Sequence, residues 1–259
     1  RVFENGDIIH VNGNIDPSRD REIIESELML ADLQTVEKRL SKAKSDCKSG
    51  NKEKIVYAEL VEKVYNFLNS GKLMIEMTLT DEESLMLKDL HLMTMKPIIY
   101  VANVDEDEIG GIDLLKLREN LKINDKFEIV PISAQIESEL VDMSNEEAME
   151  FLTAMGLKAT GRNSLIKTAY KTLGLQTYFT AGVKEVRAWT IHKGWTAPQA
   201  AGVIHTDFEK GFIRAETISC QDYVEFGGKS GAKEKGKLRL EGKEYIVQDG
   251  DVMEFLFNN

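Results

Sequence analysis

Residues 97–106 read PIIYVANVDE, and this stretch decides the fold of the chain. Its apolar, β-branched first half is short enough to be a buried strand of a parallel sheet, and it ends at Asn103. A helical stretch over residues 114–121 follows, and a second buried strand over residues 127–132 ends at Ser133. Strand, helix and strand in this order predict a parallel α/β sheet, whose ligands bind beyond the carboxyl ends of the strands. Asn103 and Ser133 should therefore share one rim of the sheet.

Upstream of this sheet the sequence has the periodicity of two long helices. Apolar residues recur at spacings of three and four along two seams, which hold Met29, Leu33, Val36, Leu40 and Ala43 in the first and Tyr57, Val61, Val64 and Leu68 in the second. We expect an antiparallel helical hairpin, or coiled coil, over residues 21–69, with the seams packed on each other rather than forming a groove for a partner. A third helix should begin at the capping-box sequence after Thr80 and run to Lys96.

Downstream, the pattern changes to short strands. From Tyr178 onward, β-branched and aromatic runs, including residues 245–247, alternate with turn signals, and residues 197–205 could form one helix that crosses the sheet. A small sheet curled around one helix is a β-grasp arrangement. The expected organisation is α/β, with a partial nucleotide-binding domain over residues 1–20 and 70–175, the hairpin inserted at 21–69, and a β-grasp domain over 176–259.

Composition limits the possible functions. The net charge is −11, and almost all of the excess negative charge lies before Gln176, because 11 Lys and Arg face 12 Asp and Glu from that residue onward. Since phosphate affinity comes from clustered Lys and Arg, only the C-terminal part is a candidate for RNA contact, and no readout of DNA sequence is expected. The longest apolar stretch, 97–104, is too short to span a membrane, so we expect a cytoplasmic protein. Cys47, Cys220 and the four histidines show no metal-ligand spacing.

The residues that follow the two strands resemble the base-binding motifs NKxD and SAK of P-loop GTPases. Here they read Asn103-Val104-Asp105-Glu106 and Ser133-Ala134-Gln135. In NKxD the asparagine amide bonds the base edge, and the final aspartate accepts from two guanine donors that adenine cannot offer. Glu106 is one methylene longer than that aspartate, and Val104 replaces the lysine. We therefore expect guanine specificity to be weak or lost.

Two longer stretches make the resemblance specific. Residues 16–40 read DPSRDREIIESELMLADLQTVEKRL, and residues 175–216 read LQTYFTAGVKEVRAWTIHKGWTAPQAAGVIHTDFEKGFIRAE. Together with the NxxE motif, they make the chain resemble the Obg-like ATPase (YchF) family over essentially its whole length. The resemblance implies a P-loop GTPase-like sheet with an inserted hairpin and a C-terminal TGS domain. It also implies ATP binding in preference to GTP, slow ATP hydrolysis and association with the ribosome, on its large subunit or through ribosomal RNA.

The resemblance assigns roles to single residues. Asn103 would bond the adenine edge, Val104 would contact the base through its backbone and side chain, and Glu106 would stand where GTPases select guanine. Ser133, Ala134 and Gln135 would close the pocket, although Gln135 departs from the usual lysine. No GxxxxGK[ST] loop occurs in the chain, so the phosphate-binding loop and the Mg²⁺ ligands are expected upstream of Arg1. We expect no catalytic residue in this chain and no ATPase activity of these residues alone.

The C-terminal part holds the candidate RNA contacts. Basic residues lie among the aromatic residues Tyr178, Trp189, Trp195 and Phe212, a mixture that suits RNA backbone contact and base stacking, and they are Lys184, Arg187, Lys193, Lys210 and Arg214. The alternative is that Trp189 and Phe212 belong to the core and the cations to a solvated face. A second basic stretch, 229–243, is expected to be a loop. If the α/β part is only a scaffold, the chain is instead a non-enzymatic RNA or ribosome adaptor.

Overall fold

The computed structural model describes residues 1–3 and 15–258. Residues 4–14 of the predicted nucleotide-binding domain lie outside the described residues. The chain divides into two compact units with separate cores, residues 1–168 and residues 169–259. In the described part of the chain, no helix combines the length and the apolar character needed to cross a membrane.

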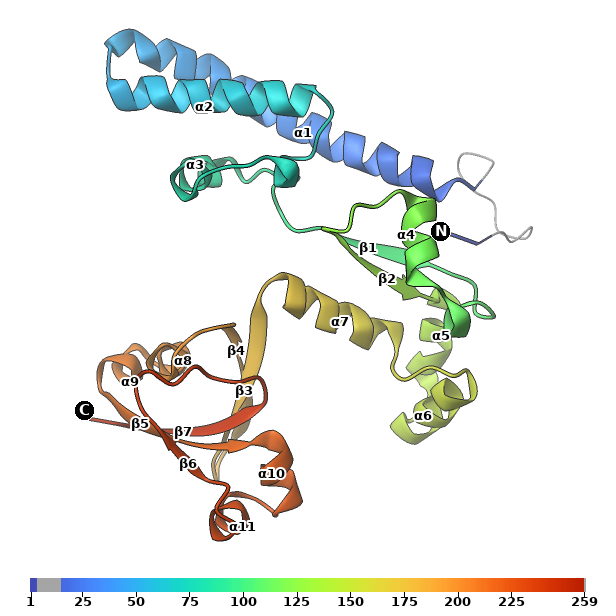
Figure 1. Cartoon of the computed structure of the whole chain (residues 1–259), viewed down its shortest axis with the longest axis vertical. Helices are drawn as coiled ribbons and strands as arrows, with labels where there is room; N and C mark the ends of the chain where they lie inside the picture. Colours follow the sequence, from blue (N-terminus) through green and yellow to red (C-terminus); the bar gives the residue numbers. More distant parts are fainter. Residues whose placement is uncertain (4–14, 259) are drawn as a thin grey trace. The chain divides into compact units, whose positions relative to one another are not determined.

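The first unit begins with two long helices that lie side by side and run in opposite directions, α1 (Pro17–Asp46) and α2 (Lys52–Asn69) (Figure 1). α1 starts where the Asp16 carboxylate accepts a hydrogen bond from the backbone N–H of Arg19 at 3.0 Å. The predicted seams meet in one core, which includes the fully buried Val36, Val61 and Val64. The two helices are thus held by the apolar periodicity that predicted them.

The third helix, α3 (Asp81–Leu87), ends well before the predicted end at Lys96. Its start is as predicted, because Thr80 caps it in a reciprocal capping box. After one further 3-10 turn, His91 adopts a φ of 49°, which a continuing helix does not allow. The backbone N–H groups of Met93 and Thr94 donate to the carboxylate of Asp32 on α1 instead of to helix carbonyls.

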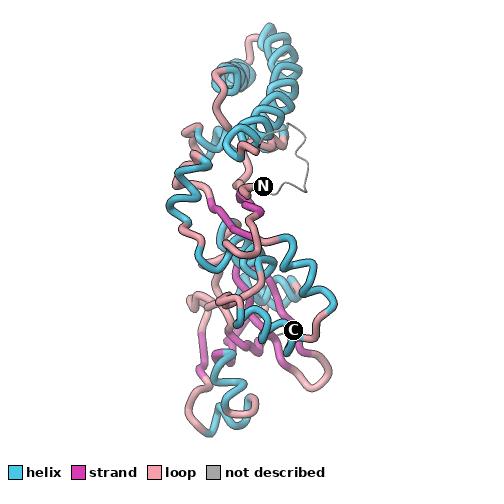
Figure 2. Tube along the Cα trace, turned by 90° about the vertical axis from the view of Figure 1, so that its right-hand side faces the viewer, coloured by secondary structure: helices cyan, strands magenta, loops and turns pink. Residues whose placement is uncertain are grey.

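A parallel pair of strands forms the sheet of the first unit, and its carboxyl ends lie level with each other. β1 (Ile99–Asn103) and β2 (Glu128–Ile132) pair so that Asn103 faces Ile132, and α4 (Leu114–Leu121) connects them. The later helices are α5 (Ala134–Glu139), α6 (Asn145–Ala154) and α7 (Gly161–Thr172). Short 3-10 turns occur at Cys47–Ser49, Met74–Glu76, Lys88–Leu90, Ile109–Gly111 and Leu140–Asp142. Helix dominates this unit (Figure 2).

The second unit is a five-stranded mixed sheet with the strand order β4-β3-β7-β5-β6. The strands are β3 (Leu175–Ala181), β4 (Val186–His192), β5 (Phe212–Ser219), β6 (Arg239–Glu241) and β7 (Asp251–Phe257). The central strands β3 and β7 are parallel, and the other neighbours are antiparallel. The helices are α8 (Ala197–Ile204), α9 (Thr206–Lys210), α10 (Cys220–Glu225) and α11 (Lys229–Glu234). α8 packs on the sheet through Ala197, Ala200 and Ala201.

Residues 245–247, predicted as a strand, are not one. A single bridge joins Ile246 to Thr196. Around this bridge the N–H of Ala197 donates to the carbonyl of Tyr245 at 2.8 Å and the N–H of Val247 donates to the carbonyl of Trp195 at 3.0 Å. The hydroxyl of Tyr245 also donates to the carboxylate of Asp251 at 2.7 Å. Asp251 is only 3% exposed and also accepts from Arg239 at 3.1 Å. One bridge and a buried carboxylate thus fix this stretch without an extended strand.

Candidate nucleotide-base site

The two strand ends that the sequence placed on one rim do meet. The backbone N–H of Val104 donates to the carbonyl of Ile132 at 2.9 Å, and the backbone N–H of Ala134 donates to Oδ1 of Asn103 at 3.0 Å. Ser133 precedes Ala134 at the N-terminal boundary of α5. The loop after β1 and the loop after β2 are therefore joined by the side chain of the asparagine.

This hydrogen bond sets the orientation of the Asn103 amide. Because Oδ1 accepts from Ala134, Nδ2 is left as a donor, and it has no acceptor among residues 1–3 and 15–258. The N–H of Ala134, in contrast, is already used. A ligand at this rim can therefore accept a hydrogen bond from Nδ2 of Asn103 but not from the backbone N–H of Ala134.

Two of the six predicted base-site residues are buried. Val104 is 3% exposed and packs in one core with Ala102, Leu121 and Ile129, and Ser133 is 2% exposed. The Val104 side chain belongs to the core of the first unit, and its contact with a base stays a prediction. Since its N–H is bonded within the sheet, Val104 can contribute only its carbonyl to a ligand.

The other members of the predicted site lie at the surface. Glu106 is exposed in the turn that follows β1, and Ala134 and Gln135 are exposed in the first turn of α5. The Gln135 side chain donates from Nε2 to the Glu139 carboxylate at 2.8 Å, one helical turn further along. Of the predicted polar side chains, the Asn103 amide and the Glu106 carboxylate are thus available for hydrogen bonds to a base.

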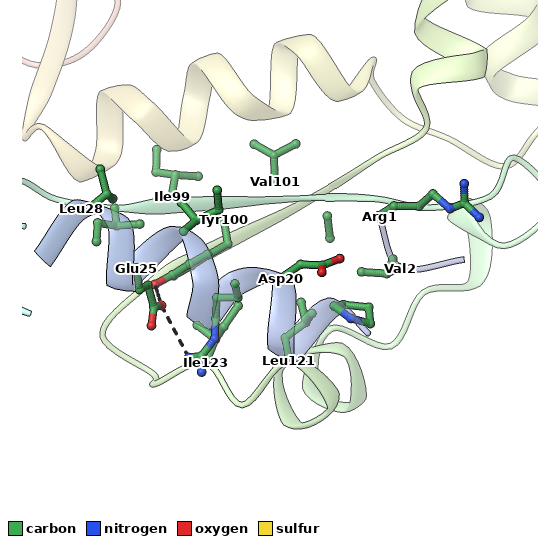
Figure 3. A pocket seen from close by; sticks show the side chains of 15 residues that line it. Arg1, Val2, Asp20, Glu25, Leu28, Ile99, Tyr100, Val101, Leu121 and Ile123 are labelled. Atoms are coloured by element: carbon green, nitrogen blue, oxygen red, sulfur yellow. Dashed lines mark hydrogen bonds and ion pairs between the residues drawn. The ribbon is translucent and has the colours of Figure 1, made fainter. Parts of the chain in front are cut away.

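A cavity of about 340 Å³ lies between α1 and β1, and it is distinct from this rim (Figure 3). Apolar side chains such as Leu28 and Ile123 form much of its lining, which includes none of the six predicted base-site residues. On its wall the Tyr100 hydroxyl donates to the Glu25 carboxylate at 2.5 Å. Burial raises the pKa of Tyr100, and the hydrogen bond to Glu25 acts in the same direction. No local sequence pattern predicts this contact, because it joins residues that are 75 positions apart in the chain.

The described residues supply neither a metal site nor a phosphate loop. No group of three or more His, Cys, Asp or Glu side chains in residues 1–3 and 15–258 is placed to hold a metal ion. The sequence contains no GxxxxGK[ST] stretch, whose backbone amides and lysine would hold phosphates. Among the described residues, the rim at Asn103 has the groups for a base.

The five predicted RNA-contact residues are exposed, but they do not form one surface. Arg187 lies on the edge strand β4 and Arg214 on β5, with β3 and β7 between them. Arg187 stacks over the Trp189 ring at 4.2 Å, on the face that packs against α8. Because side chains alternate along a strand and Ala215 is buried on that same face, Arg214 lies on the other face. The three lysines lie in turns or at a helix end, and they are Lys184, Lys193 and Lys210.

The second basic stretch, 229–243, is not the predicted loop, because it contains α11 and β6. Two of its lysines are also paired with carboxylates. Lys229 contacts Glu216 at 2.6 Å and Glu254 as well, and Lys237 lies 3.2 Å from Asp222. Lys229 and Lys237 therefore form ion pairs within the second unit.

The whole chain aligns with named proteins in a sequence comparison. Residues 175–258 match the family model YchF-GTPase_C, described as a protein of unknown function (DUF933). The full chain is 47% identical to the ribosome-binding ATPase YchF of Bacillus subtilis and 48% identical to that of Haemophilus influenzae, and covers 71% of each. The chain belongs to the YchF family. It is thereby a member of the P-loop GTPase superfamily.

Solved structures agree with a YchF fold. The YchF GTPase of Schizosaccharomyces pombe matches with a TM-score of 0.79 at 34% identity, over 98% of this chain and 69% of that one. A GTP binding protein from Pyrococcus horikoshii OT3 matches with a TM-score of 0.55 at 18% identity, over 94% and 72%, which supports the fold alone. The bacterial YchF proteins are named ATPases, whereas the Schizosaccharomyces pombe YchF is named a GTPase. The base preference of this chain must be argued from its own residues.

Proposed function

We propose that this YchF-family chain is the base-binding and ribosome-contacting part of a ribosome-associated P-loop NTPase that binds ATP in preference to GTP and hydrolyses it slowly. The preference for adenine over guanine is inferred from the hydrogen bond that the Ala134 N–H donates to Asn103 Oδ1, at 3.0 Å. The activity and the partner are supported by the relatives named ribosome-binding ATPases.

Adenine and guanine present different groups to this rim. Both carry an N7 acceptor, but guanine adds an O6 acceptor where adenine has an N6 donor. The Nδ2 donor of Asn103 can serve N7 of either base. O6 would need a further donor, and the Ala134 N–H is already bonded. Glu106 also stands where guanine readers have the shorter aspartate, so both features disfavour guanine.

Phosphate positioning and Mg²⁺ are needed for phosphoryl transfer. We place both in the part of the relatives that this chain does not cover, since it spans 71% of their length and contains no phosphate-loop motif. Purified residues 1–259 should therefore release no phosphate from ATP above background. Robust turnover in a phosphate-release assay would contradict this division of roles.

Two substitutions test the base preference in the complete protein, by competition binding of ATP and GTP. Asn103→Asp keeps an acceptor for the Ala134 N–H but removes the Nδ2 donor, so ATP affinity should fall about tenfold, as for one lost hydrogen bond. Glu106→Asp should shift the preference toward GTP. Glu108→Asp, in the same exposed turn, is the matched control and should shift nothing. A clear GTP preference of the unaltered protein would defeat the proposal.

We also propose that the second unit is a TGS domain of the β-grasp type and contacts the ribosome, on its large subunit or through ribosomal RNA. Parallel central strands, with α8 packed on the sheet, support the β-grasp assignment. The exposed Arg187, stacked on Trp189, offers RNA a cation beside an aromatic ring. Helices α1 and α2 are then the insertion in the nucleotide-binding domain, and ribosome binding would place the protein in the cytoplasm.

A further inference from the structure

The short helix α5 carries the backbone donor on which the proposed base preference depends. Ala134, whose N–H donates to Asn103 Oδ1 at 3.0 Å, is the first residue of this helix. α5 has six residues, and the side chain of Ser133 does not cap it. A helix of this length is not stable by itself in water, so contacts with the rest of the unit must hold it. Whatever holds α5 therefore also holds the Ala134 N–H in place.

Two side chains anchor α5 to the first unit. Ile136 is 2% exposed, so its side chain is buried. Glu137 is half-buried, and its carboxylate reaches the start of α7, where it accepts from the backbone N–H of Gly161 at 2.6 Å and from that of Arg162 at 3.3 Å. The first N–H groups of a helix have no partner within that helix, and a carboxylate there also interacts favourably with the helix dipole. Glu137 thus ties α5 to α7 by two charge-assisted hydrogen bonds.

The start of α7 also lies against the end of β2. A Cβ atom on Gly161 would lie 2.9 Å from Cγ2 of Ile132 and 3.1 Å from Oε1 of Glu137, so a larger residue would displace a neighbour. Ile132 faces Asn103 across the parallel pair of strands, and its carbonyl accepts from the N–H of Val104. α7 therefore contacts β2 at the residue that pairs with Asn103.

We propose that Glu137 is a positioning residue that sets the base preference, because it holds α5 so that the Ala134 N–H stays bonded to Asn103. This inference rests on the proposed preference for ATP. With the carboxylate in place the Ala134 N–H is occupied, and guanine O6 cannot accept from it. Without the carboxylate α5 loses one of its anchors, and the Ala134 N–H can turn to a bound guanine. Loss of Glu137 should therefore favour GTP, rather than weaken both nucleotides alike.

Competition binding of ATP and GTP to the complete protein tests this role. Glu137→Ala should lower the ratio of ATP affinity to GTP affinity about fivefold, as for one hydrogen bond gained by guanine. Glu137→Gln keeps an acceptor for the Gly161 N–H, so it should lower the ratio about twofold at most. Gly161→Ala, whose added methyl group would displace Ile132 or Glu137, should change the ratio in the same direction as Glu137→Ala.

Two controls separate this positioning from general effects. Thr160→Ala removes the side-chain acceptor of the Asn163 N–H, at 3.0 Å, so it weakens the start of α7 without touching α5. Glu150→Gln removes an exposed carboxylate from α6. Both should leave the ratio unchanged. The proposal would be overturned if Thr160→Ala had as large an effect as Glu137→Ala, or if Glu137→Ala weakened ATP and GTP equally.

Amide hydrogen exchange at Ala134, in the nucleotide-free chain, tests the positioning separately from the base preference. Glu137→Ala should speed exchange at Ala134 about tenfold, because the hydrogen bond to Asn103 opens more often, and Thr160→Ala should not. Unchanged exchange would overturn the positioning role, whichever nucleotide the protein prefers. Faster exchange together with a GTP preference of the unaltered protein would contradict the proposed base preference but support the positioning of Ala134 by Glu137.

Discussion

Replacing Asp32 with alanine should lower the free energy of unfolding of the first unit by about 3 kcal/mol. Asp32 is 3% exposed, and its carboxylate accepts from the backbone N–H of Met93 at 2.8 Å and from the backbone N–H and hydroxyl of Thr94, each at 2.7 Å. Alanine would leave these three donors without their acceptor. At least two of them are fully buried, because Thr94 is 0% exposed.

Urea unfolding followed by far-ultraviolet circular dichroism measures this loss. Asp32→Asn retains one acceptor oxygen and should lose less than Asp32→Ala. Glu37→Ala removes a carboxylate from the exposed face of the same helix, so it should change stability by less than about 0.5 kcal/mol. If Asp32→Ala and Glu37→Ala had the same effect, the carboxylate would not be what holds the segment after α3.

Tyr178→Ala should destabilise the second unit by about 4 kcal/mol. Tyr178 is 0% exposed, its ring meets Phe255 edge-on at 5.8 Å between centroids, and its hydroxyl donates to the carbonyl of Ala200 at 2.9 Å. Alanine would therefore leave a large cavity beneath α8. Tyr178→Phe keeps the ring and removes only the hydrogen bond, so its cost should be about 1 kcal/mol.

Tryptophan fluorescence during urea unfolding reports on this unit, because both tryptophans, Trp189 and Trp195, belong to it. Burial raises the pKa of Tyr178 above its usual 10.0. The folded state thus holds this proton more tightly than the unfolded state, so the stabilisation is complete below about pH 10 and is lost as the pH rises further. Tyr178→Phe should lose less stability in this alkaline range. A Tyr178→Ala variant as stable as the unaltered chain would show that the core tolerates the cavity.

The base rim could be predicted because its signals are local. A short β-branched run predicts a strand, and parallel strands bring their carboxyl ends to one edge. That reasoning placed Asn103 beside Ser133 correctly. It could not find the bond from Ala134 to Asn103, because the position of a side-chain oxygen relative to a loop amide depends on the register of the two strands. The prediction that the first strand is buried is wrong, because only Ala102 of β1 is buried and Val101 is 49% exposed.

The errors share a physical cause, since each depends on a contact between residues far apart in the sequence. The third helix stops at Leu87 and continues only as one 3-10 turn, and Asp32, on another helix, accepts from the backbone N–H groups of Met93 and Thr94 further along. Residues 245–247 form one bridge, to Thr196 far away in the sequence, instead of the predicted strand.

The bond between Ala134 and Asn103 has a thermodynamic consequence. A free asparagine at a loop end samples several rotamers, and a ligand that selects one must offset the lost entropy. Here folding has already restrained the amide, because its Oδ1 accepts from the Ala134 N–H and its NH₂ group is left to donate. Recognition at this edge therefore requires little reorganisation of the polypeptide, and more of the gross interaction energy remains as affinity.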